Sequence, residues 1–124
     1  MNPSIRSFLI ELARKRTNQT ISYTELCQKL NLRYDMSLNP NDRVLLRNEL
    51  EQISKYEFEK KRPLLSSLVI RKSDFEEGNG FYEMCEHLGF GNKNKLKKDV
   101  EFQARVMKNT MDFWQDEDNY IKFK

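Results

Sequence analysis

Two arginines and an asparagine on one predicted helix form the clearest chemical pattern in this sequence. Arg43 and Arg47 are four residues apart, and Asn48 follows directly. Residues four apart share a helix face, and on a helix that enters the major groove arginine can address guanine and asparagine adenine. The pattern predicts a nucleic-acid-binding helix. A solvated face is the alternative, because the same stretch carries five acidic residues: Asp42, Glu49, Glu51, Glu57 and Glu59.

Further basic residues bracket a predicted strand over residues 64–72. Lys61 and Arg62 precede this strand, and Arg71 and Lys72 end it. We expect these side chains to contact phosphates; alternatively, they keep the strand ends soluble. A second basic cluster lies near the start of the last predicted helix and consists of Lys93, Lys95, Lys97 and Lys98. It indicates either a partner surface or an ordinary solvated surface.

Residues suited to catalysis or metal binding are scarce. His87 is the only histidine, and we interpret it as a surface residue without a catalytic role. Cys27 and Cys85 form no CxxC motif, and we expect them to be reduced and half-buried. The sequence has no phosphate-binding glycine loop and no metal-ligand spacing. It therefore favours a protein that is not an enzyme and uses no cofactor or metal. The alternative is a small nuclease that uses acidic residues and His87.

Length and composition indicate a single domain, residues 1–124. The chain is 33% charged and 38% hydrophobic, with a formal charge of +3 and a mean hydropathy of −0.83. Its aromatic share of 11% argues against disorder, because enough apolar area can be buried. Residues 1–62 carry 12 Lys and Arg against 8 Asp and Glu, whereas residues 63–124 carry 10 against 11. The chain shows neither a signal-like segment nor a membrane-spanning run, so we expect a cytoplasmic protein.

The first half of the chain predicts three helices and a very short strand. Apolar residues at helical spacing predict helices over residues 5–16 and 23–31, and a third that begins at residue 40 and ends at residue 59 or 60. Residues 20–21 are expected to form the strand. Residues 33–38 are expected to be a loop. Each helix is preceded by a residue whose side chain can cap it: Ser4, Ser22 and Asn39.

The second half predicts one strand and two helices. Residues 64–72 carry apolar side chains on both faces, as in a central strand. Residues 78–80, Gly-Asn-Gly, are expected to open a short helix that stops at Gly89. A long last helix is expected over residues 95–115, followed by an acidic tail.

The long last helix has an apolar stripe wider than one core contact requires. Exposed aromatic residues mark partner sites, so the end of this stripe predicts a dimer or partner interface. The alternative is that the stripe belongs to the core. The residues expected at the interface are Met111, Phe113 and Trp114.

The order of these elements predicts a mainly α fold with a small β element (α+β). Residues 1–72 match a winged-helix-like plan, in which three helices are closed by a small sheet, and residues 73–124 form a C-terminal helical part.

One stretch of the sequence resembles a family of uncharacterised small bacterial proteins. Residues 62–72 read RPLLSSLVIRK, followed by Gly80-Phe81-Tyr82 and Leu88-Gly89. In that family, "RPLLSALVVRK", an acidic or Gly-rich loop, "GF" and "LG" recur in the same order. The resemblance covers roughly residues 5–114 and implies no activity.

A second, shorter stretch resembles the entry to the winged-helix domain of DNA alkyltransferases and alkyltransferase-like proteins. Residues 20–26 read TISYTEL. In those proteins an arginine-bearing recognition helix follows, and then Pro-Cys-His-Arg. Here Pro63 is followed by Leu64-Leu65-Ser66, so the resemblance implies a binding scaffold without the alkyl-accepting cysteine.

The sequence thus leads to three hypotheses about function. The first is a non-enzymatic nucleic-acid-binding or regulatory module, and it depends on the third predicted helix. The second is a protein-binding immunity, antitoxin or accessory factor in a bacterial or phage conflict system. The third is the small nuclease. DNA, RNA and a protein partner all stay open at this point, and no membrane partner is expected.

Overall fold

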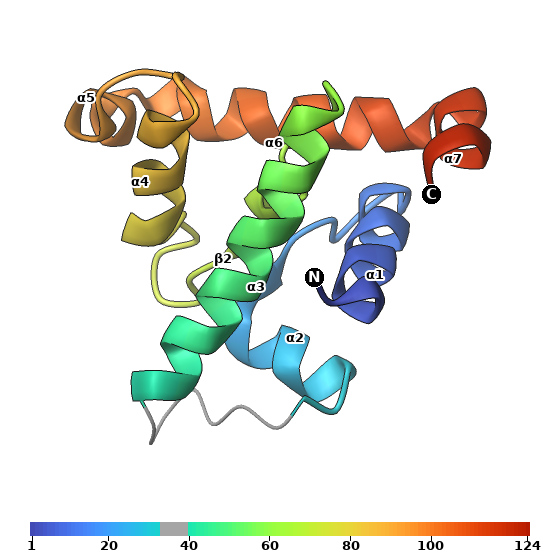
Figure 1. Ribbon diagram of the computed structural model, residues 1–124, viewed down its shortest axis with the longest axis horizontal. Helices are drawn as coiled ribbons and strands as arrows, with labels where there is room; N and C mark the ends of the chain where they lie inside the picture. Colours follow the sequence, from blue (N-terminus) through green and yellow to red (C-terminus); the bar gives the residue numbers. More distant parts are fainter. Residues whose placement is uncertain (33–39) are drawn as a thin grey trace.

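The computed structural model describes residues 1–32 and 40–124, apart from the Pro40 side chain, and there the protein is mostly helical (Figure 1). A two-stranded sheet accompanies the helices, so the expected class, mainly α with a small β element, is confirmed. The elements follow in this order: α1 Pro3–Ala13, β1 Ile21–Ser22, α2 Tyr23–Lys29, α3 Pro40–Glu59, the 3₁₀ helix η1 Leu65–Leu68, β2 Val69–Ile70, α4 Asn79–His87, α5 Lys93–Lys98, α6 Val100–Gln115 and α7 Glu117–Phe123.

Side-chain caps start the first two helices. Asn2 caps α1, because its Oδ1 accepts hydrogen bonds from the backbone N–H groups of Ser4 and Ile5 at 2.9 and 3.1 Å. The expectation that Ser4 is the cap is therefore wrong by two residues. In α2 the expected capping box is confirmed: Ser22 Oγ accepts from the Glu25 N–H at 3.1 Å and donates to the Glu25 carboxylate at 2.9 Å.

Helix α3 crosses the middle of the protein (Figure 1) and buries the apolar face that its sequence predicts. Leu46, Leu50 and Ile53 lie in the core, and the helix ends at Glu59, as expected. The expected loop over residues 33–38 and the expected cap Asn39 lie outside the described residues.

The strand expected over residues 64–72 is mostly a different structure. Residues Leu65–Leu68 form η1, and only Val69–Ile70 pair with β1. Buried serine side chains explain the bend. The Ser66 backbone N–H donates to Ser54 Oγ at 3.0 Å, and the Ser54 hydroxyl donates to Ser66 Oγ at 2.6 Å. Ser67 Oγ lies 3.1 Å from Thr110 Oγ1. These contacts attach the segment to α3 and α6 instead of to a neighbouring strand.

The expected long helix over residues 95–115 is broken at Asp99. This residue has extended backbone angles, φ −84° and ψ 98°, and separates α5 from α6. Asp99 Oδ1 accepts from the Glu101 N–H at 3.0 Å and so caps α6. The expected stop of α4 is confirmed, because Gly89 has a φ of +93° and the Phe90 N–H donates to Cys85 O at 2.9 Å.

The segment expected to be an acidic tail is helix α7, and it folds back against the end of α6. Its cap is Asp116, whose Oδ1 accepts from the Asn119 N–H at 3.0 Å. The rings of Phe113 and Phe123 stack with centroids 5.9 Å apart, and Trp114 is completely buried. Trp114 therefore belongs to the core, and the expectation that it lies at a partner interface is wrong. Met111 and Phe113 are half-buried against the same core.

The buried apolar side chains form two clusters. The larger one joins α1, α2, α3 and η1 to Trp114, and the smaller one lies beneath α4 and α6. Adjacent residues of one segment, Leu64 and Leu65, belong to the two different clusters. None of the helices in residues 1–32 and 40–124 is long and apolar enough to cross a membrane.

Candidate functional site

The parallel pairing of β1 and β2 brings Tyr23 next to Arg71. Ser22 is paired with Ile70 in register, so the residue that follows each strand leaves the sheet at the same edge. Tyr23 begins α2, and Arg71 begins the segment that leads to α4. Both side chains line one pocket. Residues of α3 and of the first turn of α4 form the rest of its lining.

We call this pocket the arginine pocket. It has a volume of about 220 Å³ and is lined by residues of α3 and of the start of α4. Three guanidinium groups, one phenol and the Gly-Asn-Gly segment supply most of its wall. The lining residues are Tyr23, Arg43, Val44, Arg47, Arg71, Gly78, Asn79 and Gly80.

Two glycines of the pocket make room for its functional side chains. A Cβ at position 80 would lie 2.3 Å from Arg47 Cδ, so the Arg47 side chain lies directly over the first turn of α4. A Cβ at position 78 would lie 3.0 Å from the Tyr23 hydroxyl oxygen. The absence of side chains at these two positions therefore determines where Arg47 and Tyr23 lie.

The Tyr23 hydroxyl is a hydrogen-bond donor at neutral pH. Burial, followed by the nearby Glu77 carboxyl, raises the pKa of Tyr23 to about 12. The Gly78 backbone, Arg71 and Arg47 oppose the shift. The phenol therefore keeps its proton and can donate it in a hydrogen bond to a ligand in the pocket.

The guanidinium groups of the pocket differ in their partners. Arg71 donates two hydrogen bonds to Asp74, at 3.3 and 2.8 Å. Arg47 is exposed and forms no ion pair within the described residues. Arg43 is also exposed and lies one helical turn before Arg47. The pocket is therefore rich in donors that prefer an anion.

The first turn of α4 adds to this preference. Gly78 is its N-cap, and no side chain caps the helix there. The positive end of the helix therefore faces the pocket wall formed by Gly78, Asn79 and Gly80. The expectation that residues 78–80 open a helix is confirmed.

Glu77 is a buried carboxyl group beside this pocket. It is 1% exposed, and neither of its oxygens has a hydrogen-bond partner within the described residues. Burial, and then the neighbouring Glu76, raise the pKa of Glu77 well above its ordinary value. Sequence reasoning missed this residue, because two adjacent glutamates in a loop resemble an ordinary solvated acidic run.

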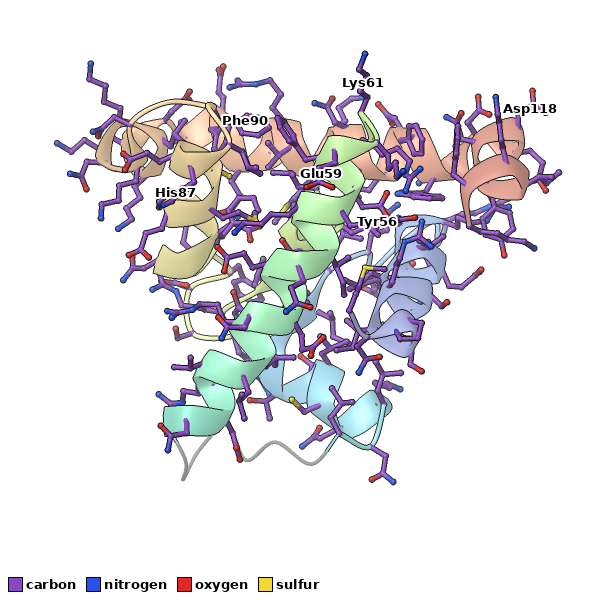
Figure 2. All side chains as sticks on the ribbon, viewed as in Figure 1. Tyr56, Glu59, Lys61, His87, Phe90 and Asp118 are labelled. Atoms are coloured by element: carbon purple, nitrogen blue, oxygen red, sulfur yellow. The ribbon has the colours of Figure 1, made fainter. Side chains whose placement is uncertain are left out.

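The remaining residues expected to bind nucleic acid lie outside the pocket. Asn48, Lys61 and Lys72 are exposed, and Figure 2 shows Lys61 beyond the end of α3, pointing away from the protein. The expectation for Arg62 is wrong, because its side chain is buried and forms an ion pair with Glu57. Arg62 is thus held by a structural contact.

The described residues do not bring histidine, cysteine or metal-ligating side chains together in one site. His87 is exposed on α4, as expected (Figure 2). Both cysteines are free, but they are buried rather than half-buried, and burial raises the pKa of each thiol, that of Cys85 to about 12. No group of three or more metal-ligating side chains occurs in residues 1–32 and 40–124. No protein-family model, curated protein or solved structure matches the chain.

Proposed function

We propose that this protein is a non-enzymatic nucleic-acid-binding module of winged-helix-like plan, and that the arginine pocket holds a phosphate of the nucleic acid. The observation that carries the proposal is the convergence of Arg43, Arg47 and Arg71 on one pocket with the Tyr23 hydroxyl. Arginine forks and hydroxyl groups are the donors most used for phosphate oxygens.

The position of α3 supports the same function. Its exposed side carries Arg43, Arg47 and Asn48, so that a strand anchored at the pocket would pass along the helix. Asn48 is then available to a base edge, and Lys72 to a neighbouring phosphate. The order α1, β1, α2, α3, β2 agrees with three helices closed by a small sheet.

The acidic residues of α3 weaken this proposal less than their number suggests. Glu57 is completely buried and bonded to Arg6 and Arg62. Glu51 pairs with Lys55 at 3.6 Å. Because these two carboxylates are already paired with cations, they repel a bound phosphate less than free ones would.

A protein-binding factor, of the immunity or antitoxin kind, is the second candidate. Two exposed apolar residues of α3 favour it. Val44 lines the pocket and is 42% exposed, and its neighbour in the chain, Leu45, is 49% exposed. Exposed apolar side chains next to arginines are common at protein interfaces.

Binding of fluorescent DNA and RNA oligonucleotides, followed by anisotropy over a salt series, tests the proposal. Replacing Arg43 and Arg47 by alanine removes two phosphate or base contacts, each worth about 1–3 kcal/mol. A matched variant, Lys122→Ala with Lys124→Ala, removes the same charge at the exposed end of α7, outside the pocket. We expect only the arginine variant to weaken binding strongly. Equal effects of the two variants, or no binding by the unaltered protein, would refute the proposal, and the second result would favour the protein-binding candidate.

A further inference from the structure

We infer that the arginine pocket takes a phosphomonoester, and specifically the terminal phosphate of a nucleic-acid strand. This inference rests on the proposed function and narrows it from any backbone phosphate to a strand end.

The hydrogen-bond donors that line the pocket come from three separate segments of the chain. Arg47 comes from α3, Arg71 follows β2, and Tyr23 begins α2. Gly80 allows Arg47 to lie against α4, and the β1–β2 register places Tyr23 beside Arg71. Such an arrangement surrounds a single anionic group, whereas a surface that follows a continuous backbone needs cations spaced along a groove.

The number and type of donors fit a monoester better than a diester. A phosphomonoester has three terminal oxygens and a charge of about −1.5 to −2 near neutral pH. An internal diester has only two such oxygens and one charge. Two guanidinium forks and one hydroxyl can serve three oxygens, because each fork can donate two parallel hydrogen bonds. The Tyr23 hydroxyl can therefore donate to the third oxygen of a monoester, whereas the two guanidinium groups alone can serve both oxygens of a diester.

Asp74 is an internal competitor for the same site. Its carboxylate accepts both hydrogen bonds that Arg71 donates to it, and Oδ1 also accepts from the Glu76 N–H at 3.0 Å. A phosphomonoester carries more negative charge than this carboxylate and can replace it at the exposed Arg71 guanidinium group. The variant Asp74→Asn keeps an oxygen for the Glu76 N–H and removes the competing charge, so it should tighten binding of a terminal phosphate.

Three oligonucleotides of one sequence test this inference: one with a 5′-phosphate, one with a 3′-phosphate and one with hydroxyl groups at both ends. We expect one phosphorylated form to bind about tenfold more tightly than the hydroxyl form, as two charge-assisted hydrogen bonds can supply. This preference should fall to about twofold or less in Arg47→Ala and Tyr23→Phe. It should persist in Lys122→Ala, at an exposed position of α7 outside the pocket, and increase in Asp74→Asn. Thermal unfolding checks that each variant is folded.

Competition by a nucleoside monophosphate and by inorganic phosphate identifies the source of the ligand. We expect both to displace the phosphorylated oligonucleotide only at much higher concentration than an unlabelled copy of it. Equally effective competition by either small molecule would overturn the assignment to a strand end. Equal binding of all three oligonucleotides, together with a loss of affinity in Arg47→Ala, would overturn the monoester and leave the proposed function intact. No binding of any oligonucleotide would overturn both.

Discussion

The Arg47 side chain of α3 packs directly against the backbone of Gly80 in α4. Any Cβ at position 80 would come within 2.3 Å of Arg47 Cδ, and Arg47 Cγ and Nε would be 3.0 and 3.2 Å away. The first turn of α4 therefore supports the side chain on which the proposed anion site depends. The nearest atoms belong to a flexible side chain, so that a larger residue at position 80 would displace Arg47 rather than unfold the helix.

The variant Gly80→Ala should weaken nucleic-acid binding without destabilising the protein. The new methyl group displaces Arg47, and we expect affinity to fall about tenfold, close to the effect of Arg47→Ala. Helix propensity favours alanine by about 1 kcal/mol, which offsets the local rearrangement. Anisotropy measures the affinity, and urea unfolding measures the stability.

The control for this variant is His87→Ala, on the exposed side of the same helix. We expect its binding to stay within about twofold of the unaltered protein, as at ordinary surface positions. Normal binding by Gly80→Ala would show that Arg47 does not need its present position. A loss of more than about a hundredfold in any activity of His87→Ala, with the fold intact, would instead indicate an acid–base role.

Replacement of Glu57 by alanine should be among the most destabilising single changes in the protein. Glu57 Oε1 accepts from Arg6 Nε at 2.6 Å, and Oε2 accepts from Arg62 Nε. Glu57 is fully buried, and the two guanidinium groups also lie over the Tyr56 ring. Its removal leaves two poorly hydrated guanidinium groups without a counter-charge, although Arg6 still donates to Phe123 O, and this costs about 3–5 kcal/mol. Urea unfolding measures this loss.

An exposed ion pair is the matched comparison for Glu57. Asp112 accepts from Lys108 at 2.6 Å, with the two side chains 59% and 74% exposed. Asp112→Ala should cost no more than about 1 kcal/mol, because water screens such a pair. Similar losses in the two variants would show that the Glu57 cluster is hydrated rather than structural.

Glu77 should make the stability of the protein depend on pH. Burial raises its pKa well above the ordinary value of 4.5, so the folded state favours the protonated carboxyl. The contribution of Glu77 is complete below about pH 4.5. As the pH increases, the unfolded chain ionises first, and the native state loses up to about 1.4 kcal/mol per pH unit until the folded protein also ionises.

The neutral variant Glu77→Gln should lack this loss and become the more stable protein as the pH increases. Urea unfolding of both proteins between pH 4 and pH 8 gives the difference in free energy. The variant Glu59→Gln, at an exposed position at the end of α3, should keep the pH dependence of the unaltered protein. Parallel curves for Glu77→Gln and the unaltered protein would mean that Glu77 is hydrated in solution.

Phe113→Ala should destabilise the protein without changing its mass in solution. Phe113 stacks on Phe123 and meets the Trp114 ring edge-on, with centroids 5.0 Å apart. Because α7 already covers this ring, its removal should cost about 1–3 kcal/mol of folding free energy. The control is Ile121→Ala on α7, which is 64% exposed and should have little effect. A change of mass in light scattering with unchanged stability would restore the expected interface at Met111 and Phe113.

Local features of the fold could be predicted from the sequence wherever a few neighbouring residues determine them. The capping box of Ser22 and Glu25 and the stop at Gly89 are confirmed, because each depends on hydrogen bonds within one helical turn. The break at Asp99 was missed, although it is also local. Its residues are compatible with one helix, and the two segments contact different partners, α4 for α5 and α1 for α6.

The sequence by itself determined which helix carries the arginines and that Arg43 and Arg47 share its exposed face, since helical spacing decides both. Only the tertiary structure decided which basic side chains line the pocket. Arg71 reaches the pocket through the pairing of two strands nearly fifty residues apart in the chain, and Arg62 is withdrawn into the core by Glu57. The physical reason is that residue spacing determines which side chains share a helix face over a few residues. Whether basic side chains from different segments meet or become buried depends on contacts between distant parts of the chain. Those contacts exist only when the whole chain packs.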